Sequence, residues 1–144
     1  MNLPTMAVSL FQPWPWAVLY LLKDVENRTW ATKYRGPILL HAGKRFFLPE
    51  VRDNVRRCLE TTTSKAPRSF FLRFTTENLR NQTGGIVGMV TIKDCITNSP
   101  SPWAEPGRRH WLLADPKPLP FFPCKGRLGL FPVEYPQHLL EAVA

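Results

Sequence analysis

The sequence predicts an α+β fold, a small mixed β-barrel decorated with two to three short helices. Its 144 residues, 44% of them hydrophobic, are enough for one domain with a sizeable core. Fifteen prolines divide the chain into short elements, which favours strands and loops over a helical bundle. Several apolar runs of strand length are interspersed with a few helical ones. We therefore expect a single domain over residues 1–144.

The first expected strand, residues 6–10, leads into a short apolar helix over residues 14–22. The helix is expected to begin at Pro13 or Pro15, because proline suits the first turn of a helix, where its missing N–H is not needed. Trp14 and Trp16 point about 200° apart on a helix. Both could pack in the core, or one of them could stand at the mouth of a cleft.

Residues 25–30 follow with alternating character and are expected to form a strand. The alternation places Glu26, Arg28 and Trp30 on one face. Lys23, at the junction of helix and strand, can fold over the same face. This arrangement gathers an ammonium, a carboxylate and a guanidinium, which form either a self-neutralising ion network or a polar site.

The centre of the fold is expected in two apolar strands. Residues 38–42 form a continuous apolar run that contains His41, a histidine more often structural than catalytic in such a place. Residues 86–96 contain the clearest strand, and Gly88 within it indicates a bulge or a close approach of another backbone.

A second helix is expected over residues 48–60. Arg52 and Arg56 form one row on it, with Lys44 and Arg45 just upstream. This row is either a solvated helix face or a ridge that contacts phosphates.

The other expected elements are shorter. They are a loop over 61–69, a buried apolar stretch at Phe70-Phe71-Leu72, a helical turn at 76–80, a proline-rich loop at 99–109, a strand at 111–114, a turn at 115–118, strands at 119–122 and 128–133, and a terminal helical turn within 136–144.

Charge and cysteine usage limit the class of protein. The formal net charge is +8, which favours a polyanionic partner such as nucleic acid, although some small proteins are merely basic. Cys58, Cys95 and Cys124 are far apart and odd in number, so we expect no zinc site and a reducing, cytoplasmic compartment. No apolar run is long enough to span a membrane, and no signal peptide is evident.

Familiar nucleotide and metal motifs do not occur in the sequence. There is no P-loop, no GxGxxG after a strand, no GxSxG and no HExxH. We therefore expect no metal and no cofactor.

The motifs together resemble the ASCH domain of the PUA-like superfamily, over a core of about residues 8–133. The family pattern G-x-K-x-x-E-x-R is matched by Lys23, Glu26 and Arg28, with Leu21 where glycine is usual. The other resembling segments are Ser9-Leu10-Phe11-Gln12-Pro13-Trp14, Arg35-Gly36-Pro37, Leu40-His41-Ala42-Gly43-Lys44, Gly85-Ile86-Val87-Gly88 with Asp94-Cys95, Trp111-Leu112-Leu113 with Pro118-Leu119, and Lys125-Gly126-x-Leu128-Gly129-Leu130-Phe131.

The resemblance implies a PUA-like barrel with a cleft beside the first helix, lined by the Lys/Glu/Arg motif and suited to RNA or a nucleobase-like ligand. Some ASCH proteins remove the acetyl group of N4-acetylcytidine, and others are described as ribonucleases. In the deacetylating group the lysine matched here by Lys23 is catalytic, but that group has threonine where this chain has Glu26.

We predict a nucleic-acid-binding module with a preference for RNA, while DNA or a nucleoside is a further possible ligand. The residues expected to bind are Gln12 at a base edge, Trp14, Trp16 and Trp30 as stacking faces, Lys23, Glu26 and Arg28 at a phosphate or carbonyl, and Lys44, Arg45, Arg52 and Arg56 along phosphates. One alternative is a small hydrolase of a modified nucleoside or of RNA, with Lys23 as base or nucleophile, or with Glu26 as the general base instead. Another is an interaction domain with no ligand in the cleft.

Overall fold

The computed structural model of the chain describes residues 2–62 and 76–141, and in these ranges it contains six strands and four helices. The strands are β1 (Met6–Leu10), β2 (Val25–Arg28), β3 (Gly36–Ala42), β4 (Gly85–Ile96), β5 (Arg109–Pro123) and β6 (Leu130–Pro132). The helices are α1 (Trp14–Tyr20), α2 (Leu48–Thr61), α4 (Thr76–Asn81) and α5 (Gln137–Glu141). The predicted α+β class is confirmed.

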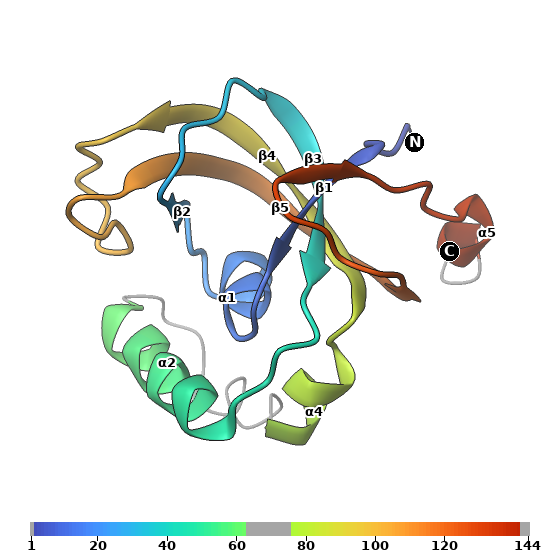
Figure 1. Cartoon of the computed structure of the whole chain (residues 1–144), viewed down its shortest axis with the longest axis horizontal. Coiled ribbons are helices and arrows are strands. Elements are labelled where there is room, and N and C mark those ends of the chain that lie inside the picture. Colours follow the sequence, from blue (N-terminus) through green and yellow to red (C-terminus); the bar gives the residue numbers. More distant parts are fainter. Residues whose placement is uncertain (1, 63–75, 142–144) are drawn as a thin grey trace.

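One mixed sheet carries all six strands in the order β2-β5-β4-β3-β1-β6. Strands β1 and β3 run parallel, and the other neighbouring strands are antiparallel. Figure 1 shows the sheet curling over α1. In the described part of the chain β2 and β6 do not pair with each other, so the sheet is not closed and the predicted small mixed β-barrel is not confirmed.

Helix α1 lies between the sheet and the pair α2 and α4, as Figure 1 shows. Val18 and Leu19 pack on the inner face of the sheet, while Trp16, Ala17 and Leu21 pack against α2 and α4. A helix that buries apolar groups on both sides is expected to be apolar all round, and the sequence of α1 fits this.

A second apolar cluster covers the other face of the sheet. It contains Leu39, Ile86 and Phe131 from the strands, with Leu139 and Leu140 packed against it. Helix α5, within the segment where a terminal helical turn is predicted, therefore docks on this face of the sheet.

Strand β5 departs from the sequence prediction. Residues 115–118 were expected to form a turn between two strands, but β5 continues through them and pairs with β4. The register shifts there, and Asp115 has φ 52°, so a bulge absorbs the extra residues without ending the ladder. Gly88 of β4 has a close neighbour as predicted, because a Cβ there would lie 2.8 Å from the Lys117 carbonyl oxygen.

Strand β2 ends at Arg28, so Trp30 lies just beyond the strand in which it was predicted. The expected buried stretch at Phe70-Phe71-Leu72 and most of the expected loop at 61–69 lie outside the described residues. Among the helices of the described ranges, none has the length and apolar content needed to cross a membrane. A cytoplasmic location stays a prediction.

Candidate functional site

The turn between α1 and β2 places Lys23. Leu22 adopts a left-handed backbone with φ 59°, and the Lys23 N–H donates to the Ala17 carbonyl at 3.2 Å. Leu21, at the motif position usually held by glycine, has φ −111° and is buried. Leucine therefore fits the backbone at this position without strain.

Three charged side chains form a continuous ion chain behind this turn. Lys23 Nζ lies 3.3 Å from Glu26 Oε1 and also donates to the Val25 carbonyl, and Arg28 Nη1 lies 3.5 Å from Glu26 Oε2. Lys23 is 4% exposed and Glu26 is 7% exposed. Strand alternation and the α1–β2 turn thus bring the predicted motif residues together, as an ion network.

Aromatic rings enclose both ends of this ion chain. The Trp14 ring centroid lies 5.3 Å from Lys23 Nζ, and the Trp30 and Trp111 ring centroids lie 5.5 and 5.6 Å from the Arg28 guanidinium carbon. Trp111 Nε1 also donates to the Trp30 carbonyl at 3.2 Å, which fixes the backbone of Trp30. Both cations therefore have restricted positions.

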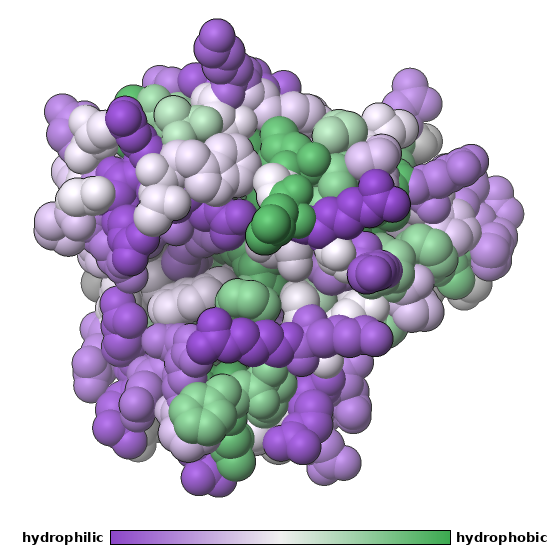
Figure 2. Space-filling model, in the orientation of Figure 1, coloured by the Kyte–Doolittle hydropathy of each residue, from purple (hydrophilic) through white to green (hydrophobic). Residues whose placement is uncertain are grey.

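The ion chain borders a cavity of about 490 Å³, called here the first cavity. It lies between the start of α1, the end of α2 and the loop before β5. Figure 2 shows the surface hollowed between the sheet side of the molecule and α2, with hydrophilic residues around the hollow. The lining residues that carry charged or aromatic groups are Phe11, Trp14, Lys23, Glu26, Arg28, Arg57, Trp103, Glu105 and Arg108.

The outer wall of the first cavity is the loop over residues 99–108, and hydrogen bonds hold it. Asn27 Nδ2 donates to the Trp103 carbonyl at 2.9 Å, and the Glu105 N–H donates to Asn27 Oδ1 at 2.9 Å. His110 accepts the Ser99 N–H through Nδ1 at 3.1 Å and donates to the Glu105 carbonyl through Nε2 at 2.7 Å. Strand β2 and the start of β5 therefore position the loop that carries Trp103.

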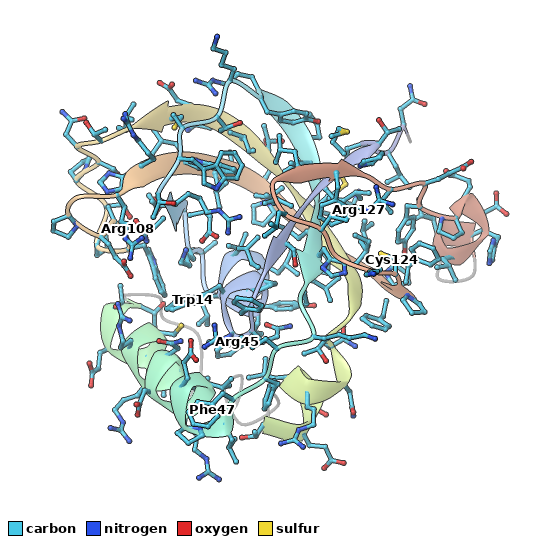
Figure 3. All side chains as sticks on the ribbon, viewed as in Figure 1. Trp14, Arg45, Phe47, Arg108, Cys124 and Arg127 are labelled. Atoms are coloured by element: carbon cyan, nitrogen blue, oxygen red, sulfur yellow. The ribbon has the colours of Figure 1, made fainter. Side chains whose placement is uncertain are left out.

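A second cavity of about 1010 Å³ adjoins the first. The two share Ser9, Phe11 and Arg28 in their linings, so they form one groove. Figure 3 shows Arg108 on the loop before β5 and Arg127 on the segment after β5, on opposite sides of the view. The other lining residues of the second cavity are Trp30, His41, Gly43, Lys44, Gly84, Pro123, Cys124, Lys125, Gly126, Leu128 and Gly129.

His41 forms the floor of the second cavity. Its Nε2 donates to the Cys124 carbonyl at 2.8 Å, so its Nδ1 accepts from Ser9 Oγ at 2.9 Å. Burial lowers the pKa of His41 below its ordinary value. Both ring nitrogens have partners, which agrees with the structural role expected for a histidine in a central strand.

The sequence that forms this groove also identifies the family of the chain. The family model of the ASCH domain matches residues 8–128, most of the chain. This chain belongs to the ASCH domain family. No curated protein gives a significant match.

Several residues predicted for the ASCH site lie elsewhere. Trp16 is 3% exposed in the cluster between α1, α2 and α4. Gln12 donates to the Gln82 carbonyl at 3.0 Å and accepts the Trp16 N–H at 3.4 Å, so it ties α1 to the end of α4. Neither lines the two cavities of the groove.

The predicted basic ridge is divided by the fold. Lys44 lines the second cavity, whereas Arg45 pairs with Glu50 at 3.0 Å and lies over the Phe11 ring. Arg52 and Arg56 are exposed on α2 and line neither cavity.

Several charged or aromatic residues that line the ASCH groove were not predicted from the sequence. Trp103, Arg57 and Arg108 line the first cavity, and Lys125 and Arg127 line the second. Two features of the sequence could have indicated these residues: Trp103 stands in a long polar loop, and Lys125 and Arg127 flank a glycine. No grouping of His, Cys, Asp and Glu suited to a metal occurs in residues 2–62 and 76–141.

Proposed function

We propose that this ASCH domain binds single-stranded RNA in the groove formed by the two cavities. The observation that carries the proposal is the buried Lys23–Glu26–Arg28 ion chain, which lies at the wall of a cavity among indole rings. Proteins bind single-stranded nucleic acids by placing cations and aromatic rings along one groove, where the cations contact phosphates and the rings stack on bases.

The size of the first cavity supports a base-sized ligand. Its volume of about 490 Å³ falls within the usual range for small-ligand pockets, roughly 300–1,000 Å³. Trp14 and Trp103 line it with indole rings, and the ion chain lines it with polar atoms. Such a pocket suits one unstacked base with its hydrogen-bonding edge turned to the wall.

The geometry favours binding over hydrolysis. A general base needs an oxygen within hydrogen-bond reach of the proton it removes. Each oxygen of Glu26 is already within 3.5 Å of a cation, Oε1 of Lys23 and Oε2 of Arg28. The carboxylate therefore serves to hold the two cations.

The test is fluorescence anisotropy of a labelled single-stranded RNA 8-mer of mixed sequence, with the matching DNA as a second probe. Trp103→Ala should weaken RNA binding by about 5- to 150-fold, the range that follows from losing roughly 1–3 kcal/mol of base stacking. Phe47→Ala is the matched control, because Phe47 is 60% exposed and lies outside both cavities.

Thermal denaturation of both variants separates loss of stacking from loss of fold. Absence of binding by the wild-type chain to either probe would refute the proposal, as would equal effects of the two substitutions. DNA bound as tightly as RNA would refute the preference for RNA. Consumption of the RNA or of N4-acetylcytidine by the wild-type chain would instead establish the hydrolase alternative.

A further inference from the structure

The two cavities differ in how their cations are paired. In the first cavity each carboxylate lies near two cations: Glu26 near Lys23 and Arg28, and Glu105 near Arg57 at 3.2 Å and Arg108 at 3.8 Å. Every cation that lines this cavity therefore has a carboxylate partner.

Among the described residues, none that lines the second cavity is acidic. Lys44, Lys125 and Arg127 line it together with Arg28, and within the described ranges the first three are in no ion pair. Figure 3 shows Arg127 on the segment that follows Cys124. An anion entering this cavity meets positive charge that is not already neutralised.

The backbone that carries these cations is fixed at several points. The Cys124 N–H donates to the Gly84 carbonyl at 3.1 Å, and the Cys124 carbonyl accepts from His41. Gly126 lies so close to His41 that an added Cβ would be 2.7 Å from ring atom Cε1. The stem of Lys44 lies against Gly84, where a Cβ would be 3.1 Å from Lys44 Cγ. Because this backbone is already held in place, binding of an anion costs less conformational entropy.

We infer that the groove separates the two parts of a nucleotide strand: the second cavity holds backbone phosphates on Lys44, Lys125 and Arg127, and the first cavity receives a base. This inference rests on the proposed function and adds a location for the electrostatic part of binding. It assigns salt-dependent affinity to Lys44 and to the segment between β5 and β6, and not to Arg52 and Arg56 of α2.

The size of the effect follows from counterion release. Each phosphate contact to a single strand contributes about 0.7 to the slope of log K against log salt. The double variant Lys125→Gln/Arg127→Gln should lower the magnitude of that slope by about 1.4. If the electrostatic contribution of the two side chains vanishes near 1 M salt, this change corresponds to an affinity about 25-fold weaker near 0.1 M salt. Both side chains are exposed, so the fold does not depend on them.

The experiment titrates the full chain with the labelled RNA 8-mer at several salt concentrations. The matched control is Arg52→Gln/Arg56→Gln, which removes the same net charge from exposed positions outside the groove. The control should leave the slope unchanged, and the charge-preserving Lys125→Arg/Arg127→Lys variant should keep the wild-type slope.

The outcomes distinguish the two levels of the argument. If the wild type binds RNA but the two double Gln variants lose the same slope, the phosphate location is wrong and the proposed function stands. If the wild type binds neither RNA nor DNA, both are overturned. A flattened slope in the charge-preserving variant would also contradict the inference, because the charge would then not be the cause.

Discussion

Replacing Glu26 by glutamine tests whether the ion chain holds the fold together. Glu26→Gln keeps the shape of the side chain and removes the only carboxylate within ion-pair distance of Lys23 and Arg28 in the described residues. Arg28 is 22% exposed and can turn to water, but the Lys23 side chain is 3% exposed and cannot. One buried cation is therefore left without a counter-charge.

An uncompensated buried charge typically costs about 3–5 kcal/mol. We expect about 3 kcal/mol for Glu26→Gln, the lower end of this range, since the Val25 carbonyl still accepts from Lys23. For a chain of this size that corresponds to a fall in Tm of about 6–12 °C. Urea denaturation followed by tryptophan fluorescence gives the free energy directly.

Glu50→Gln is the matched control. Glu50 pairs with Arg45 at 3.0 Å, but both side chains are well exposed, at 44% and 61%. Exposed pairs of this kind contribute about 0–1 kcal/mol. A loss for Glu26→Gln no larger than for Glu50→Gln would refute the reasoning. Adding Lys23→Met to Glu26→Gln should recover part of the stability, because the buried charge itself is then removed.

Two further predictions concern buried titratable groups. Because burial lowers the pKa of His41, the unfolded chain takes up a proton first as the pH falls. The contribution of His41 to the free energy of unfolding should therefore be fully present above about pH 6.5. Between that pH and the pKa of His41 in the folded chain, the free energy of unfolding should fall with decreasing pH, by at most about 1.4 kcal/mol per pH unit. Denaturation at several pH values measures this pH dependence. The His41→Gln variant should lose the dependence, whereas His138→Gln, at an exposed position, should keep it. The same slope of stability against pH in both variants would contradict the prediction. Burial also raises the pKa of Cys58 to about 12, so iodoacetamide near pH 8 should label the half-buried Cys95 in the native protein and leave Cys58 unmodified. Equal labelling by mass spectrometry would contradict the packing of Cys58 of α2 against α1.

The order of the elements could be predicted because local patterns determine it. The apolar run of α1, the alternation of β2 and the β-branched run of β4 each point to one structure. The Lys23–Glu26–Arg28 grouping was also predictable, since a short turn and a two-residue strand period bring these side chains together.

The rest depends on contacts between distant segments. The prolines at 116 and 118 indicate a turn locally, but pairing with β4 and a bulge at Asp115 keep β5 continuous. Gln12 has the chemistry to contact a base, yet the end of α4 and the backbone of α1 occupy its amide. No local pattern reports these partners.

Helix α2 shows the same limit at the level of the site. Arg52 and Arg56 stand out as a row with helical spacing, whereas the arginine that reaches the first cavity is Arg57. Its position follows from the burial of Val51 and Cys58 against α1, which sets the rotation of α2 about its axis. The guanidinium of Arg57 then lies 5.8 Å from the Trp14 ring centroid and pairs with Glu105.

Arg28 is the point at which the two halves of the groove meet. It lines both cavities, pairs with Glu26 on one side and lies over the rings of Trp30 and Trp111 on the other. A strand with its base in the first cavity and its phosphates in the second must pass this guanidinium. Lysine would keep the charge but lose the planar group that fits between a carboxylate and two indole rings. The chemistry of arginine, and not positive charge alone, therefore suits this position.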